Sequence, residues 1–262
     1  MESESIRNRS AARTALHDVA RRVAGTEQLS DDEMLLDVLA PIAGLFPDRG
    51  LRRGRVVVLA GRSAATSLLL AILAGPVAHG AWGGVVGMPH IGLEAAAGFG
   101  VTPDRLLLVP QPGPEWPAVV ATMLDALDLV AVSPPSPCRP AIARRIATRA
   151  REHRSVLLIA PPAASRAPGP HQCEPAWPEA ADLHLEADAG PWQGIGKGSG
   201  VLQSRLVTVR SSGRRSSGVE RSVQIWLPAP NGQVALGGED HVAHRGSAGG
   251  QSSKAPASSL AG

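Results

Sequence analysis

Hydrophobic residues in the middle of the chain form short runs that alternate between two spacings. Valine- and leucine-rich runs predict strands buried on both faces. Between these runs, apolar residues recur every three or four positions, as they do on one face of a helix. The alternation predicts an α/β fold with a mostly parallel sheet joined by right-handed helical crossovers. The expected strands are 55–60, 82–88, 105–109, 129–132 and 156–160, and the expected helices are 64–73, 93–99, 118–127 and 141–152.

Both ends of the chain depart from this pattern. After residue 180, "ADLHLEA", "SRLVTVRSS" and "RSVQIWLP" alternate apolar and polar residues, which predicts later antiparallel strands. Near the N-terminus, Ile6–Val23 predicts a basic amphipathic helix, and Ser30 with Glu33 predicts the capped start of a second helix. The Gly-, Ser- and Ala-rich end predicts disorder. The expected organisation is an N-terminal helical segment (1–48), an α/β core (49–230) and a disordered tail (231–262).

Composition narrows the functional classes. The chain has 262 residues, 3% aromatics and no tyrosine, so aliphatic side chains must build the core. A net charge of +3 permits weak DNA contact without requiring it. His171, Cys173 and His184 lack the spacing of a zinc site, and we expect no metal or cofactor. The polar N-terminus and the lack of an apolar run of about 18 residues predict a cytoplasmic protein without membrane contact.

The segment "RVVVLAGRSAATSLLLAIL" has the strand, glycine loop and helix of a nucleotide-binding P-loop. A working P-loop has the pattern GxxxxGK[ST], whose lysine contacts phosphate and whose hydroxyl binds Mg²⁺. With Gly61 as the first glycine, Thr66 occupies the second glycine position, Ser67 the lysine position and Leu68 the hydroxyl position. Each replacement removes a different part of the phosphate chemistry, so we expect neither ATP hydrolysis nor another catalytic activity.

A serine hydrolase is an alternative for the same segment. "GRSAA" approaches the G-x-S-x-G nucleophile elbow, in which Ser63 would be the nucleophile. Asp182 and His184 follow in the chain order of a hydrolase triad. Two features oppose this hypothesis: Ala65 replaces the second glycine, and the loop follows the first strand of the core. An ATP-dependent DNA-binding recombinase is another open alternative.

The chain from about residue 51 to 228 resembles the core of RecA-type recombinases. "FGVTPDRLLLVPQP" is the most specific part, and "ADLHLEADAGPWQGIGKGSGVLQSRLVTVRSSGR" is similar to the late RecA strands. The resemblance implies a P-loop-type core. At the position of the RecA catalytic glutamate this chain has Met88 or Pro89, and at the Walker B aspartate it has Ser133. Pro161 or Pro162 replaces the glutamine that senses the γ-phosphate.

A small RecA-like chain with a degenerate P-loop is similar to the ImuA-prime proteins of actinobacteria. That resemblance implies a non-catalytic adaptor in SOS mutagenesis, acting in DNA repair by translesion synthesis after DNA damage. Its implied partners are an ImuB-like Y-family polymerase homologue and an error-prone replicative-type DNA polymerase. The cell-division inhibitors of the SulA type, which also have a RecA-like fold without a P-loop, are a competing family.

Arginine-rich stretches supply candidate partner or DNA surfaces. The helix expected at 141–152 has apolar residues on one side and Arg144, Arg145 and Arg149 among its polar positions. A solvated face is the ordinary explanation of such a charge run, and a DNA or acidic-partner surface is the alternative. The same two explanations apply to Lys197 in "GIGKGSG" and to the run that contains Arg214 and Arg215.

Overall fold

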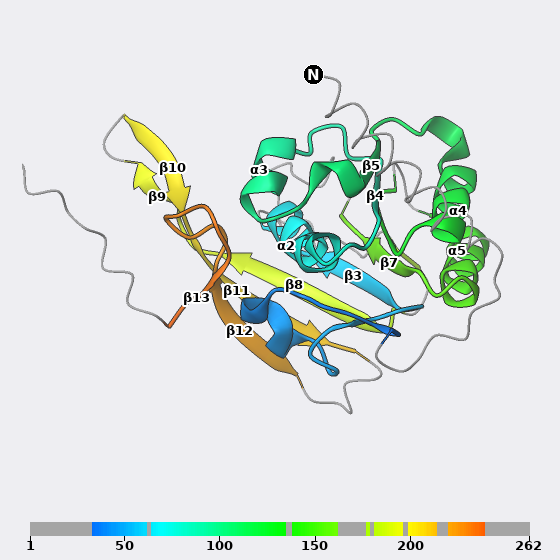
Figure 1. Cartoon of the computed structure of the whole chain (residues 1–262), viewed down its shortest axis with the longest axis horizontal. Coiled ribbons are helices and arrows are strands. Elements are labelled where there is room, and N and C mark those ends of the chain that lie inside the picture. The colour runs from blue at the N-terminus through cyan, green and yellow to red at the C-terminus, as the bar shows by residue number, and fades with distance from the viewer. Residues whose placement is uncertain are drawn as a thin grey trace, which may run out of the picture.

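The computed structural model describes residues 33–61, 64–134, 138–161, 177–178, 181–195, 199–213 and 220–238. The helix predicted over Ile6–Val23 and most of the predicted tail lie outside these residues. Within them the chain is an α/β structure with one large sheet and helices on both faces (Figure 1).

The large sheet has nine strands in the order β13-β12-β11-β8-β3-β7-β6-β4-β5. The six strands from β8 to β5 run parallel, and β11, β12 and β13 continue the sheet antiparallel. This confirms the mostly parallel sheet expected from the sequence. The strands are β3 (Val56–Ala60), β4 (Gly83–Val86), β5 (Leu106–Val109), β6 (Leu129–Val132), β7 (Val156–Ile159), β8 (Leu183–Ala189), β11 (Leu206–Ser212), β12 (Arg221–Trp226) and β13 (Ala235–Leu236).

Helices cover both faces of this sheet, so the hydrophobic core consists of two clusters, one on each face. Along β3, Val57 and Leu59 pack with helix α2, whereas Val56 and Val58 pack with α4 and α5. This alternation explains why the strand is a continuous apolar run, since both of its faces are buried. The helices are α2 (Ala65–Ala78), α3 (Leu93–Gly98), α4 (Trp116–Ala126) and α5 (Pro140–Glu152), with 3-10 turns η1 (Ala40–Leu45), η2 (Pro103–Arg105) and η3 (Gly113–Glu115).

Strand β8 was expected to be antiparallel, and it is so on only one side. It pairs antiparallel with β11 on one side but parallel with β3 on the other. Leu183, Leu185 and Ala187 are buried while His184 and Glu186 are exposed. The alternation of apolar and polar residues in β8 therefore indicates that one face of the strand is exposed. A parallel strand can also have one exposed face, so the pattern does not determine the strand direction.

The prediction of a helix starting near Ser30 is also wrong for the residues described. Leu35–Leu36 forms the short strand β1, which pairs with β2 (Leu51–Arg52). The segment then makes only the 3-10 turn η1, which contains Pro41 at its start. The Ser211 hydroxyl, on β11, donates a hydrogen bond of 2.6 Å to the Leu45 carbonyl, which fixes this turn against the antiparallel strands.

At the other end, the ordered sheet extends beyond the predicted boundary at residue 231. Strand β13 pairs with the end of β12 at Ile225 and Trp226. Strands β9 (Gln193–Ile195) and β10 (Gly200–Ser204) pair antiparallel with each other and project from the main sheet (Figure 1).

Candidate functional site

The loop that resembles a P-loop lies between β3 and α2, at the carboxyl edge of the parallel strands (Figure 1). Strand β3 is flanked by β7 and β8, so the loop is well inside the sheet. Open α/β sheets bind ligands at this edge. Arg62 and Ser63 lie outside the described residues, and the described part of the site consists of Gly61 and the residues from Ala64 onward.

Gly61 is required by the packing of the sheet itself. Its φ of +119° lies in the region that favours glycine. A Cβ added there would overlap the carbonyl oxygen of Ala187 on β8. The glycine that begins the motif therefore has a structural cause in this chain, independent of any phosphate.

The start of α2 packs into the hydrophobic core. Ala64 and Leu68 are both fully buried, and the Leu68 amide donates to the Ala64 carbonyl over 2.8 Å. In a working P-loop the residue at the Leu68 position presents a hydroxyl to Mg²⁺. Here that position holds an aliphatic side chain of α2 that is packed in the hydrophobic core. It cannot bind a cation.

Ser67, at the lysine position, contacts a buried arginine instead of a ligand. Nη2 of Arg205 donates to the Ser67 hydroxyl over 3.1 Å. Arg205 is only 4% exposed, and its Nε donates to the Leu227 carbonyl over 3.2 Å. Its guanidinium also lies 4.4 Å from the centre of the Trp192 ring, a cation–π contact. The positive charge beside α2 therefore comes from a residue far along the chain.

Burial lowers the pKa of Arg205 from its ordinary value, although an arginine remains charged at neutral pH. Neutral partners surround it: a carbonyl, a hydroxyl and an aromatic ring. Among the described residues, no ion pair joins it to a carboxylate. A buried charge is costly unless it is hydrogen-bonded. The guanidinium is therefore stabilised in the position where it makes these contacts.

Sequence reasoning missed Arg205, although a signal was present. Val207, Val209 and Ser211 alternate as buried positions along β11. Extending that period by two residues toward the N-terminus reaches Arg205, on the same buried face. A charged residue in phase with a buried strand face is the pattern that identifies it.

Two of the remaining ATP-handling positions, Ser133 and Met88, also make internal contacts. Ser133, at the Walker B position, is 5% exposed, and its hydroxyl donates to the Pro161 carbonyl over 3.1 Å. Met88 is partly buried and packs against the core beside α2, whereas Pro89 is exposed. Pro162 lies outside the described residues. No carboxylate stands at either of the acidic positions of the motif.

Two members of the proposed hydrolase triad, Asp182 and His184, lie at the amino end of β8, and the third, Ser63, lies outside the described residues. Asp182 accepts a hydrogen bond of 3.0 Å from the Val56 amide, at the start of β3, and His184 lies in register with Val58. The loop with Ser63 follows the other end of β3. At about 3.3 Å per residue, roughly 15 Å or more of strand separates Asp182 from that loop.

Two of the predicted basic positions, Arg144 and Arg145, are exposed on α5. Arg149 is instead bound to α4, where its Nε and Nη2 donate to the two Asp125 carboxylate oxygens over 2.6 and 2.5 Å. This contact raises the pKa of Arg149. Lys197, Arg214 and Arg215 lie outside the described residues.

The described part of the chain contains no group of three His, Cys, Asp or Glu side chains that could hold a metal ion. Its helices are all too short or too polar to cross a membrane.

Comparisons with known proteins match the first part of the fold. Residues 44–165 match the family model of the MT3502 N-terminal domain. The Mycobacterium tuberculosis protein named "Uncharacterized protein Rv3395c" is 38% identical over 107 residues, which are 40% of this chain and 51% of that protein. The chain thus spans about half the length of this curated relative. The family match includes the degenerate loop, α4, α5 and Ser133, and it ends before β8 and Arg205.

Proposed function

We propose that this chain is a non-catalytic RecA-like adaptor in SOS or damage-induced mutagenesis. It binds an ImuB-like polymerase homologue in the cytoplasm and brings it together with an error-prone replicative-type DNA polymerase for translesion synthesis. It uses the loop region as a structural element and neither binds nor hydrolyses ATP. Its function is to bind partner proteins through its surface.

The order of elements supports the RecA-like part of this proposal. The most RecA-like stretch, "FGVTPDRLLLVPQP", begins directly after α3 and includes the turn η2 and strand β5. Ser133 directly follows a buried parallel strand, as a Walker B residue does. The late segments form antiparallel strands that extend the same sheet beyond β8.

The observation that carries the non-catalytic part is the contact between Arg205 and Ser67. The position that would supply a phosphate-binding lysine instead accepts a hydrogen bond from a buried internal cation. Leu68 and Ser133 likewise use their side chains within the protein. Because phosphoryl transfer depends on positioned charge and metal, loss of these groups removes the means of catalysis.

Recovery of partners from damaged cells tests the adaptor role. Tagged full-length chain, expressed at its native level, is captured after DNA damage, and co-purifying proteins are identified by mass spectrometry. We expect a Y-family polymerase homologue and a replicative-type polymerase, enriched over undamaged cells, and we expect deletion of the gene to lower damage-induced mutation. Recovery of the division GTPase instead would favour the SulA-type alternative. Normal mutation frequency after deletion would contradict the adaptor role.

A further inference from the structure

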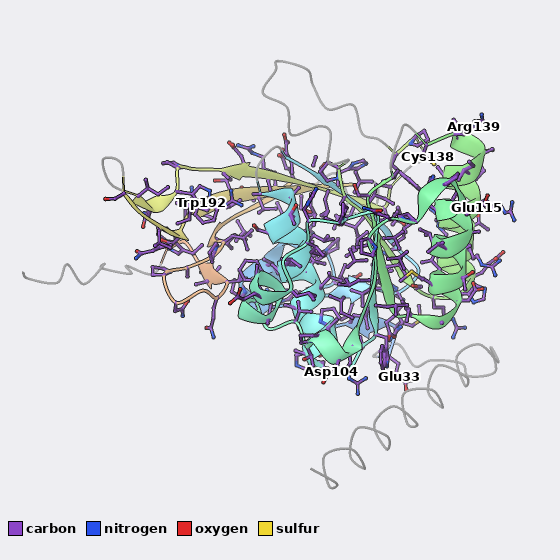
Figure 2. The ribbon with its side chains drawn as sticks, turned by 90° about the horizontal axis from the view of Figure 1, so that it is seen from above. Glu33, Asp104, Glu115, Cys138, Arg139 and Trp192 are labelled. Atoms are coloured by element: carbon purple, nitrogen blue, oxygen red, sulfur yellow. The ribbon has the colours of Figure 1, made fainter. Side chains whose placement is uncertain are left out.

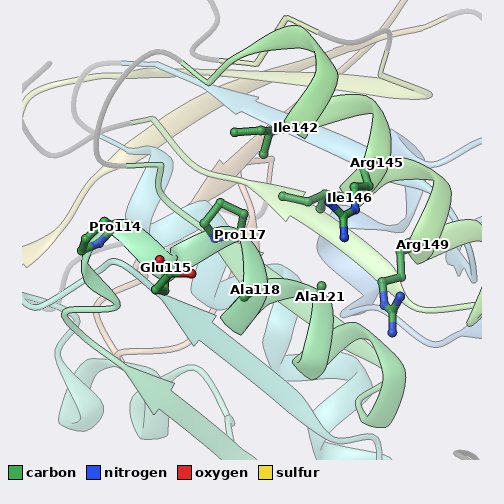
Figure 3. A pocket seen from close by; sticks show the side chains of 9 residues that line it. All are labelled: Pro114, Glu115, Pro117, Ala118, Ala121, Ile142, Arg145, Ile146 and Arg149. Atoms are coloured by element: carbon green, nitrogen blue, oxygen red, sulfur yellow. The ribbon is translucent and has the colours of Figure 1, made fainter.

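A groove of about 300 Å³ runs between helices α4 and α5, on the sheet face opposite α2. Figure 3 shows Ile142, Arg145 and Ile146 extending from α5 toward α4. Figure 2 places Glu115 and Arg139 at this end of the molecule, far from Trp192. The groove is thus separate from the degenerate loop and its arginine.

The floor of the groove is apolar. Pro117, Ala118 and Ala121 line it from α4, and Ile142 and Ile146 line it from α5. Because α4 presents alanines here, the two helices leave space that larger side chains would fill. At about 300 Å³ the groove is at the small end of pockets that hold ligands or anchoring side chains.

One end of the groove is closed by a fixed contact. Arg149 makes its two hydrogen bonds to Asp125, and Nε2 of His153 lies 3.4 Å from the same carboxylate. These contacts bind α5 to the last turn of α4, so the groove keeps its width without an occupant.

Two charges of opposite sign, Glu115 and Arg145, line the groove and are unpaired among the described residues. Arg145 is exposed and has no ion pair among the described residues. Arg149 is neutralised by Asp125, while Glu115 occupies the N-cap position of α4, where the helix dipole favours a negative charge. Arg139, at the start of α5, is also exposed but does not line the groove. An occupant with negative charge beside Arg145 is therefore favoured.

We propose that this groove is the docking site for an acidic amphipathic helix of a partner protein. Leucine-sized side chains of that helix fill the space between Ala118, Ala121 and the two isoleucines, and a carboxylate pairs with Arg145. This is helix-in-groove recognition, in which apolar anchors at i, i+3, i+4 and i+7 enter an apolar groove. The inference deepens the proposed function, on which it rests for the identity of the partner.

Other occupants fit less well. A DNA backbone would leave the apolar lining of the groove without a contact. The lining residues include no aromatic side chain for base stacking. A second copy of this chain that docked through the same face would bring the exposed arginines of its own α5, Arg144 and Arg145, to the groove, and these would not supply a carboxylate for Arg145.

Fluorescence anisotropy with a model peptide tests the proposal on the full-length protein. The labelled probe is an acidic peptide of about 18 residues, which spans five helical turns. It has leucines at i, i+3, i+4 and i+7 and glutamates between them. Control peptides replace the leucines with alanine or the glutamates with lysine. Poly-dT single-stranded DNA serves as a competitor.

Three variants locate the binding. Arg145→Glu reverses the charge at the groove, and Ala118→Trp fills the groove with a bulky side chain. Arg139→Glu makes the same change in net charge on the same helix but outside the groove lining. All three positions are exposed, so circular dichroism melts should match the parent protein.

The expected result is saturable micromolar binding of the acidic leucine peptide that neither control peptide shows. Arg145→Glu should weaken it about tenfold or more, Ala118→Trp should abolish it, and Arg139→Glu should leave it within about twofold. Equal binding by all variants would overturn the proposal. Competition by poly-dT, or self-association that Ala118→Trp abolishes, would overturn it in favour of DNA or a second copy.

Failure of this test is distinguishable from failure of the adaptor role. The peptide assay requires neither damaged cells nor the native partner. If the peptide fails to bind but polymerases are still recovered from damaged cells, only the location of the docking site is wrong. If the peptide binds but deletion leaves mutation unchanged, the groove stands and the proposed function does not.

Discussion

A pair of opposite charge substitutions at Ser67 tests whether Arg205 supplies the charge beside α2. Ser67→Asp places a carboxylate within reach of the guanidinium, and Ser67→Lys restores the P-loop lysine. Ser67 is partly exposed, so both side chains can be accommodated. The first turn of α2 has no acidic residue and its N-cap makes no side-chain hydrogen bond, so the new carboxylate would also be favoured by the helix dipole.

The magnitude follows from the 3.1 Å that separates Arg205 Nη2 and the Ser67 hydroxyl. Unit charges about 4 Å apart interact by about 4 kcal/mol at an effective dielectric constant of about 20. Partial desolvation of the carboxylate opposes this attraction, and charge-assisted hydrogen bonds contribute about 1.5–3 kcal/mol net. We therefore expect Ser67→Asp to raise the free energy of unfolding by about 1–2 kcal/mol and Ser67→Lys to lower it by a similar amount.

Thermal melts at pH 7 measure the effect, because about 1 kcal/mol shifts Tm by about 2–4 °C in a chain of this size. Repeating both substitutions in an Arg205→Met background isolates the pairwise interaction. There the lysine should lose most of its penalty and the aspartate most of its gain. Shifts of the same sign for Asp and Lys, or shifts unchanged by Arg205→Met, would refute the role given to Arg205.

Three other predictions concern residues that the sequence motif singled out or left aside. Gly61→Ala should lower stability by about 2 kcal/mol or more in urea unfolding, because its φ is positive and its Cβ meets Ala187. Ser133→Ala should cost about 1 kcal/mol by the same method, since it leaves the Pro161 carbonyl without its hydroxyl donor. Burial raises the pKa of the Cys138 thiol. Stability due to this thiol is therefore complete below the unfolded pKa of about 8.5 and is lost as pH rises through the folded value, which alkaline unfolding curves measure.

Each of these has a matched control. Gly80 also has a positive φ, of +96°, but open space around its Cβ position, so Gly80→Ala should cost less than Gly61→Ala. Ser212→Ala, at an exposed position, should be nearly neutral. For Cys138, comparison with Cys138→Ala removes the thiol contribution. Equal costs for the two glycines would show that contact with Ala187 is unimportant.

The sequence predicted the parallel part of the fold because its strands are buried on both faces. β6 (Leu129–Val132) matches the expected bounds, and β3 and β7 differ by one residue at one end. Helix α2 continues beyond the predicted end at residue 73 to Ala78, with Pro76 inside its last turn. Tertiary packing explains this extension. Gly75 and Pro76 are buried, and Gly75 lies against the backbone of Asp37 and Val38.

Local patterns failed where long-range pairing decides the structure. Leu35 and Leu36 occur in a helix-like stretch, but their pairing with β2 makes them a strand. Alternation along β8 could not show that one neighbour is parallel and the other antiparallel. These outcomes depend on residues distant in the chain, which periodicity does not reveal.

The candidate site was predicted in part. The motif located the loop and the unusual residues Ser67, Leu68 and Ser133, because a P-loop has a fixed spacing. It could not reveal Arg205, which is 138 positions from Ser67 and belongs to no motif. The groove between α4 and α5 was equally hidden, since it arises from small alanines on one helix that face isoleucines on another.

Isothermal titration calorimetry of the full-length protein with Mg²⁺ and ATP tests the central claim most directly. The account predicts no saturable heat up to millimolar nucleotide, both for the parent protein and for Arg205→Met. Saturable binding at micromolar nucleotide that is abolished by substituting Ser67 with tryptophan would contradict the account. It would show that the loop still binds a triphosphate.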